Sequence, residues 1–183
     1  GYHKPTIGHP DDFVFDVIDE VLTEGVTSRL YSTLVRDKRL AASVLSDTNY
    51  PGVRAPNLFV IAATPLAPHS VTEVETAIYE ELDRLKTEPI SAKEFERVLN
   101  GLDADLVRSL RSNSGLASQL AFYQTVAGTW RYVLNARDRI AAVTPADVQR
   151  VAAQYLTKPN RTVGVLVKKA QDKKMAAAGE VAR

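Results

Sequence analysis

Residues 25–44 read GVTSRLYSTLVRDKRLAASV and combine three local signals within twenty positions. Gly25 favours a turn, and the residues from Ser28 onward have the spacing of an amphipathic helix with Leu30 and Leu34 on its inward face. The stretch ends at the start of an expected strand over residues 42–48. A helix that leads directly into a strand is typical of a domain in which helices pack against a sheet.

The residues before this stretch predict a strand end and a helix. Residues 1–5, GYHKP, resemble the end of a strand whose beginning lies upstream, so we expect a fragment of a longer protein. Residues 8–12, GHPDD, then precede apolar residues that recur every three or four positions through Leu22. Pro10 suits a first helical turn, the two aspartates favour the positive end of the helix dipole, and Gly25 ends the helix.

The residues after it predict a second strand and a long helical block. Residues 58–63, LFVIAA, form a short apolar run typical of a buried strand. Ser70 with Glu73 and Ser91 with Glu94 have the spacing of capping boxes, and Pro145 suits a first helical position. We expect helices over 70–85, 91–110, 116–128, 130–140 and 145–155, with a kink near 112–115, and a closing strand over 162–167.

These elements indicate an α+β fold in which helices pack on one face of a largely antiparallel sheet. No repeat period and no interior linker divides the chain. We therefore expect residues 1–168 to form one domain. Residues 169–183 contain alanine and charged residues with little to bury, and they predict a mobile tail.

The composition excludes several classes of partner and site. Of 183 residues, 45% are hydrophobic and 25% charged, as in an ordinary globular protein. Lysine and arginine number 23 against 22 acidic residues, so the net charge of +1 predicts neither a nucleic acid nor a membrane as partner. The chain has no cysteine, which excludes disulfides and thiolate metal sites and suits cytoplasm and periplasm equally. Localisation stays open.

Taken in order, GYHKP, GHPDD, residues 25–44, the segment ending in Ala-Thr-Pro and the Thr-Pro-Ala-Asp cap carry a family resemblance. The chain resembles the C-terminal, metal-free domain of the pitrilysin and insulinase type zinc metallopeptidases, a group that includes mitochondrial processing peptidase and bacterial two-subunit relatives. The resemblance implies a half-chamber. It also implies, as partners, an upstream zinc-bearing domain, a homologous subunit in a heterodimer, and unfolded peptide substrates.

The resemblance places zinc outside this chain. In the family, two histidines of an inverted H-x-x-E-H motif and a distant glutamate hold the metal, all in an N-terminal domain. This sequence contains only His3, His9 and His69, and no two of them share a helical face with a glutamate between them. We therefore expect no metal or cofactor site here, and zinc in the N-terminal domain of the parent protein.

The resemblance also implies that two functional groups are missing. Active members carry an arginine and, seven residues later, a tyrosine that bind the substrate carbonyl and stabilise the oxyanion. A gapless match puts Val35 and Ala42 at these positions. Arg36 is one position off, which on an α-helix turns it by about 100°. A one-residue shift would put Ser43 in place of the tyrosine, so we expect no catalytic residue.

Three residues of the same stretch are candidates for contact with a substrate or partner: Ser28, Arg29 and Arg36. For Arg29 the alternative is a structural role, because an arginine in the first turns of a helix can anchor a neighbouring carboxylate. Asp103 and Asp105, with Glu94 and Glu96, could be mistaken for acid and base pairs. They lie on the expected polar side of a long helix, where a solvated face is the simpler interpretation.

Two functions remain open. The first is a non-catalytic C-terminal domain of a zinc-dependent endopeptidase that encloses peptide substrate and packs on the zinc-bearing domain. The alternative is a scaffold or interaction domain of a wholly non-proteolytic homologue. In either case this chain alone should not hydrolyse peptides. An H-x-x-E-H motif upstream in the parent protein would distinguish the two.

Overall fold

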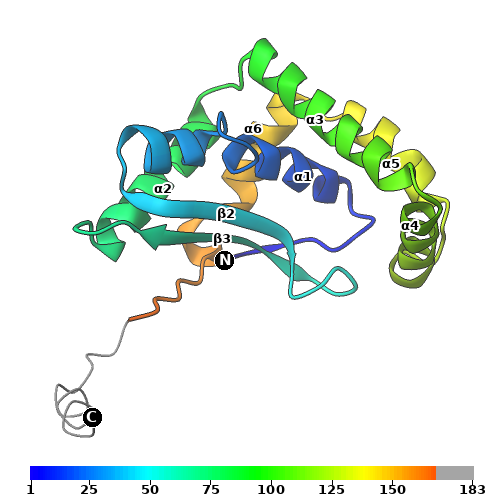
Figure 1. Ribbon diagram of the computed structural model, residues 1–183, viewed down its shortest axis with the longest axis horizontal. Coiled ribbons are helices and arrows are strands. Elements are labelled where there is room, and N and C mark those ends of the chain that lie inside the picture. Colours follow the sequence, from blue (N-terminus) through cyan, green and yellow to red (C-terminus); the bar gives the residue numbers. More distant parts are fainter. Residues whose placement is uncertain (168–183) are drawn as a thin grey trace, which may run out of the picture.

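The computed structural model describes residues 1–167, which form an α+β fold as predicted (Figure 1). In chain order the elements are β1 (Tyr2–Lys4), α1 (Pro10–Leu22), the π-helix η1 (Tyr31–Asp37), β2 (Ala41–Tyr50), β3 (Asn57–Pro65), α2 (Val71–Thr87), α3 (Ala92–Leu110), α4 (Asn113–Val126), α5 (Tyr132–Ala141), α6 (Pro145–Tyr155) and the 3₁₀ turn η2 (Lys158–Asn160). The tail predicted over 169–183 lies outside the described residues.

The sheet is small and antiparallel, with strand order β1-β3-β2. Tyr2 pairs with Phe59 at the short β1 end, and Val44 pairs with Ala63 between β2 and β3. The register of β2 shifts twice, between Ala41 and Ser43 and again between Asp47 and Tyr50, whereas β3 runs regularly. Side chains therefore alternate cleanly along β3 between a helix-facing side and an open side.

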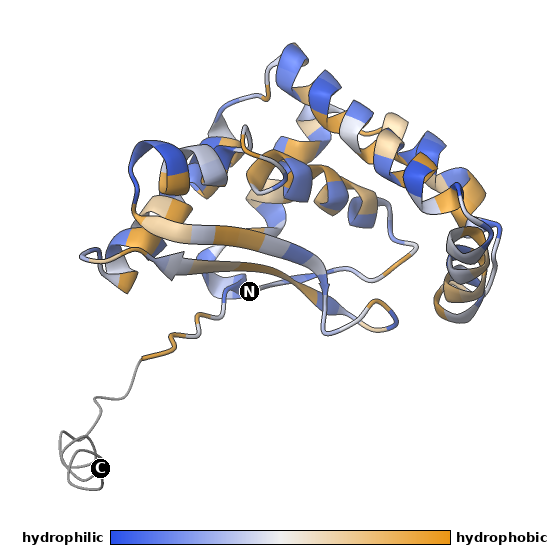
Figure 2. Cartoon of the chain, viewed as in Figure 1, coloured by the Kyte–Doolittle hydropathy of each residue, from blue (hydrophilic) through white to orange (hydrophobic). Residues whose placement is uncertain are grey.

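The core lies between α1, α2, α6 and the helix-facing side of the sheet. Phe15 of α1 is fully buried and contacts Phe59 of β3 and Tyr155 of α6, with ring centroids 5.6 Å and 5.5 Å apart. Burial of apolar area of this kind is the main favourable contribution to folding. Figure 2 shows hydrophobic residues over much of β2 and β3. The prediction of helices on one face of the sheet is confirmed.

The helix boundaries follow local signals in the sequence. Ser70 and Glu73 form a capping box at α2, and Thr144 and Asp147 form another at α6. The long helical block is interrupted between α3 and α4, where the Ser112 hydroxyl accepts a hydrogen bond from the amide of Gly115 at 2.9 Å. α3 and α5 lie side by side, and α4 follows at one end of the molecule (Figure 1).

One sequence-based prediction is confirmed with a difference, and one is wrong. The helix expected from Ser28 onward is present with Leu30 and Leu34 buried, but residues 31–37 wind as a π-helix, with the Lys38 amide donating to the Thr33 carbonyl at 3.0 Å. Residues 162–167 are extended but form no strand, because a strand requires a hydrogen-bonded neighbour. Only an isolated bridge between Tyr2 and Arg161, and a pair of bonds between Gly1 and Thr162, reach this segment.

Candidate functional site

The turn after α1 holds two of the three residues proposed to contact a substrate or partner. Ser28 is fully buried, and its hydroxyl donates to the Gly25 carbonyl at 2.8 Å. Gly25 has a φ of 75°, a conformation that side chains with a Cβ rarely adopt. This hydrogen bond therefore closes the turn that leads into η1.

Arg29 is joined to α3 by a two-point ion pair. Its Nε and Nη2 atoms donate to Oε1 and Oε2 of Glu94, both at 2.8 Å, and its side chain is only 14% exposed. The hydrogen bond raises the pKa of Arg29 and, in turn, holds the pKa of Glu94 below its usual range. This geometry fixes the start of η1 against the first turn of α3. The expectation that Glu94 lies on a solvated helix face is therefore wrong, because its carboxylate is covered and paired with Arg29.

The third candidate, Arg36, lies at the exposed end of η1. Its guanidinium donates to the carboxylate of the adjacent Asp37 at 2.7 Å and 3.0 Å, with more than half of each side chain exposed. Val35 beside it is half-buried and packs against the core. The Val35 side chain offers neither a charge nor a hydrogen-bond donor.

Ala42 stands at the first register shift of β2 and is exposed. A methyl group there cannot supply the hydroxyl that the tyrosine of active members provides. Val35 lies on η1 and Ala42 on β2, two elements that follow directly in the chain. Neither side chain has a group that could stabilise an oxyanion.

The histidines lie at separate places. His3 is exposed on β1, and Nδ1 of His9 accepts from the Asp11 amide at 3.1 Å as the cap of α1. His69 lies 3.3 Å from Glu73 at the start of α2. Among residues 1–167 no three histidine, aspartate or glutamate side chains gather where they could hold a metal ion.

The comparisons with known proteins identify the family. Residues 1–102 match the family described as "Peptidase M16 inactive domain". The chain belongs to this family. This match confirms the resemblance to the C-terminal, metal-free domain of zinc metallopeptidases that was drawn from the sequence.

Three relatives show how far the likeness extends. The zinc protease PqqE of Helicobacter pylori is 27% identical over 85% of this chain and 34% of its own length. An uncharacterized zinc protease of Streptomyces coelicolor is 30% identical over 83% of this chain and 33% of its own. The crystal structure of an inactive peptidase domain from Bordetella parapertussis matches with a TM-score of 0.80 and 27% identity, over 93% of this chain and 91% of that one. The chain thus spans about a third of the length of its curated relatives.

One side of the sheet of this M16 domain is open, because the helices pack on the other side. On β2, Leu45 is 56% exposed, whereas the neighbouring Val44 on the helix side is only 9% exposed. On β3 the open side carries Leu58, Val60, Ala62 and Thr64, opposite the buried Phe59. The result is an apolar strip along β3 that includes Leu45 of β2, with Ser43 and Asp47 on either side of this leucine.

A polar layer lies between α1 and β2 on the other side. Lys4 is buried and donates to Asp12 at 2.5 Å and to the Thr48 carbonyl at 2.9 Å. Burial raises the pKa of Asp16 to about 7, with the nearby Asp12 adding to the effect, and burial raises that of Asp19 to about 6. These carboxyl groups lie beneath the sheet, away from its open side.

Sequence reasoning missed both the open apolar strip and this acidic layer of the M16 domain. In a strand, every second side chain of residues 58–63 points to the same face, so half of this apolar run had to lie on the open side. A run that is apolar throughout, however, predicts burial on both faces. The acidic layer could have been found from Asp12, Asp16 and Asp19, which recur at spacings of four and three on one face of α1. Among the described residues, no helix is both long and apolar enough to cross a bilayer.

Proposed function

We propose that this M16 inactive domain is the non-catalytic C-terminal domain of a zinc-dependent endopeptidase. Its role is to enclose an extended, unfolded peptide and to pack against the zinc-bearing domain of the same polypeptide. The observation that carries the proposal is the open side of the sheet, where Leu45, Val60 and Ala62 form an uncovered apolar strip. Exposed contiguous apolar surface of this kind marks interaction sites.

The chemistry of the site supports a role without catalysis. Among the described residues, Val35 and Ala42 carry no donor and the histidines are dispersed, which supports a role in which groups of another domain perform peptide hydrolysis. The zinc proteases among the relatives are consistent with a metal in another domain of the parent protein. There, zinc would activate the attacking water. Of the three candidate contact residues, we assign peptide or partner contact to Arg36, because its side chain is the one that is largely exposed.

The second candidate function is a scaffold in a homologue without proteolysis, with a homologous subunit covering the same strip. The two functions differ in one property that can be measured. A peptidase domain requires the strip for turnover of peptides, whereas a scaffold requires it only for assembly.

The test is made in the full-length protein with its homologous partner. Leu45→Lys places a charge on the open strip, and Leu134→Lys, at a leucine that is 60% exposed on α5, is the matched control. We expect Leu45→Lys to reduce cleavage of an unfolded peptide about tenfold or more, with assembly unchanged, and Leu134→Lys to leave cleavage unchanged. Absence of cleavage in the unmodified complex, or equal loss in both variants, would overturn the proposal.

A further inference from the structure

A cavity of about 160 Å³ lies between α1, α4 and α5, at the end of the molecule that α4 occupies (Figure 1). Asn49 at the end of β2 and Val53 in the loop that follows it close the cavity on another side. Asp12 and Asp16 line it from α1, four positions apart and therefore on one face of the helix. The cavity is separate from the open apolar strip on the sheet.

The wall opposite these carboxyl groups is aromatic. Tyr132 of α5 stacks on Phe13 and on Tyr123, with ring centroids 5.6 Å and 5.1 Å apart. Phe122 meets Tyr123 in an edge arrangement at 5.2 Å and is 45% exposed, so this series of rings ends at solvent. Aromatic rings of this kind attract alkyl groups and, through their faces, cations.

The acidic side of the cavity is incompletely paired. Asp12 accepts from Lys4, whereas the one hydrogen bond to Asp16 among residues 1–167 is a long contact of 3.5 Å from the Thr48 hydroxyl. Of the described residues that line the cavity, none is a lysine, arginine or histidine. Burial raises the pKa of Asp16 to about 7, with Asp12 adding to the effect, because a covered carboxylate without a cation is unfavourable.

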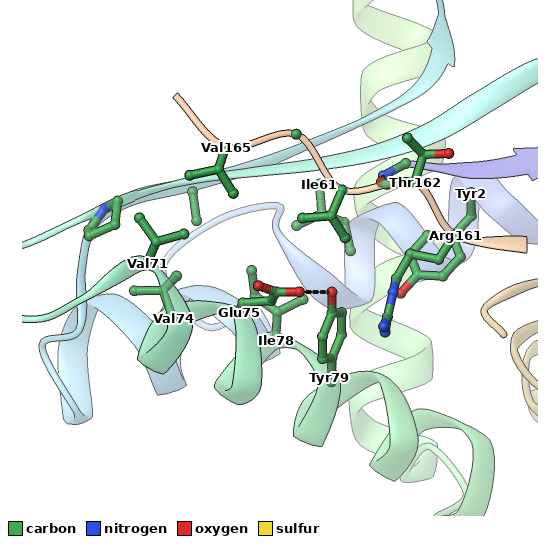
Figure 3. Close-up of a pocket in the computed structure, with 15 residues that line it drawn as sticks. Tyr2, Ile61, Val71, Val74, Glu75, Ile78, Tyr79, Arg161, Thr162 and Val165 are labelled. Atoms are coloured by element: carbon green, nitrogen blue, oxygen red, sulfur yellow. Dashed lines mark hydrogen bonds between the residues drawn. The ribbon is translucent and has the colours of Figure 1, made fainter. Parts of the chain in front are cut away.

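Another cavity of the same chain shows the surroundings of a guanidinium that the protein itself supplies (Figure 3). The Arg161 guanidinium lies 3.8 Å from the centroid of the Tyr79 ring, and the Tyr79 hydroxyl donates to Glu75. This arginine thus has an aromatic ring and a carboxylate as neighbours. The cavity beside α1 offers the same two kinds of group, but no guanidinium of the described residues lines it.

We propose that the cavity beside α1 binds an alkylguanidinium cation, with the charged group against Asp16 and the alkyl part along the rings of Tyr123 and Phe122. Two N–H groups of a guanidinium match the two oxygens of a carboxylate, and its flat face stacks on aromatic rings. The donor set does not suit a metal ion, because among residues 1–167 no three carboxyl or histidine side chains gather. The inference does not depend on the proposed function.

An alkylguanidinium can come from two sources that share this chemistry. One is the side chain of an arginine in a peptide, and the other is a free small molecule. The test therefore uses both forms, each with a neutral counterpart in which the guanidinium is replaced by a urea group of nearly the same shape.

The first measurement is an NMR titration of the full chain with N-ethylguanidinium and with N-ethylurea at equal ionic strength. We expect saturable shifts of the Asp16 and Tyr123 amides with N-ethylguanidinium only. Asp16→Asn should weaken this binding about tenfold or more, because it removes the charged acceptor. Asp138→Asn, at an exposed position of α5, is the control and should leave the affinity unchanged. Urea midpoints of both variants separate a loss of binding from a loss of folding.

A second pair of variants tests the aromatic wall. Phe122 and Leu116 both lie on α4 and are 45% and 41% exposed, but Leu116 does not line the cavity. We expect Phe122→Ala to weaken binding of N-ethylguanidinium about threefold or more. Leu116→Ala should leave it unchanged.

The affinity should also depend on pH. With a pKa of about 7, Asp16 is roughly one-tenth ionised at pH 6 and nine-tenths at pH 8, so the affinity should rise about tenfold over this range. The guanidinium itself stays charged throughout. The charged and titratable groups that act on Asp16 or face it are Asp12, Asp19, Lys4, Tyr123 and Tyr132. Asp16→Asn should remove most of the rise.

The peptide arm compares acetyl-Gly-Arg-Gly-amide with its citrulline counterpart. Binding of the arginine peptide at least as tight as that of N-ethylguanidinium assigns the cavity to a peptide side chain, and entry of the free compound alone assigns it to a small molecule. Either result supports the shared chemistry. Equal responses to N-ethylguanidinium and N-ethylurea, undiminished binding in Asp16→Asn, or the absence of saturable shifts at these amides would overturn the inference.

Discussion

Arg29 and Glu94, 65 residues apart in the chain, are joined by two hydrogen bonds of 2.8 Å each. The pair connects the turn after α1 with the first turn of α3, and both side chains are largely covered, at 14% and 22% exposed. An ion pair with two parallel hydrogen bonds between a guanidinium and a carboxylate has a defined geometry, unlike a single contact between mobile side chains. It therefore positions the entire stretch from Ser28 into β2.

Arg29→Ala should lower the free energy of unfolding by about 1.5–3 kcal/mol, because it leaves the covered Glu94 carboxylate without its charged partner. Urea unfolding measures the change. Arg36→Ala is the control, since Arg36 is exposed and pairs only with its neighbour Asp37. We expect no measurable change there. Equal losses in the two variants would contradict the structural role of Arg29.

The same pair should make stability depend on pH at the acid end. The pKa of Glu94 is lower in the folded state than its ordinary value of 4.5. Its contribution is thus fully present above about pH 4.5 and is lost as the pH falls through the folded value. The difference in urea midpoint between the unmodified chain and Glu94→Gln should shrink below pH 4. A difference that stays constant down to pH 3 would argue against this.

Asp16 should make the protein less stable as the pH rises, the opposite of the effect of Glu94. Burial raises its pKa to about 7 from an ordinary value of 3.8, so between these values the folded state binds the proton more tightly than the unfolded state. Stability from this group therefore falls as the pH rises from about 4 through 7. Asp16→Asn should gain stability over the unmodified chain at pH 8 but not at pH 4. Asp138→Asn, at an exposed position of α5, is the control. Its stability should change with pH in the same way as that of the unmodified chain.

Gly115 should tolerate no side chain. An added Cβ would lie 2.2 Å from the Ser109 carbonyl oxygen, because the turn between α3 and α4 is tight. Gly115→Ala should cost about 1–3 kcal/mol, with the loss measured by urea unfolding. Gly52→Ala is the control, since nothing lies within 4 Å of its added Cβ and its φ is not positive. A neutral Gly115→Ala would show that the turn can open.

Local features of the fold were predictable because their causes are local. The caps at Ser70 and Thr144 depend on residues three positions apart, and both helices begin where the sequence indicates. The helix at 31–37 was predictable from its apolar spacing, but its π-type winding was not, because π-helices are rare and no residue in this stretch signals one. The segment 162–167 has the pattern of a strand, but pairing depends on a neighbour that the pattern does not contain.

In the candidate site, too, local features could be predicted from the sequence, and contacts between distant segments could not. The match of Val35 and Ala42 to the two functional positions stays a prediction from the order of residues between Ser28 and Val44. The partner of Arg29 could not be predicted, since Glu94 lies on a distant helix. The apolar strip around Leu45 depends on which side of the sheet the helices cover, a property of tertiary packing.

Isothermal titration of zinc into the purified chain, with a parallel peptide-cleavage assay, tests most directly that catalysis lies outside this domain. We expect no stoichiometric binding and no cleavage, because His3, His9 and His69 lie apart and neither Val35 nor Ala42 carries a group that could stabilise an oxyanion. Tight one-to-one binding that is abolished by His3→Ala or His9→Ala would contradict this expectation.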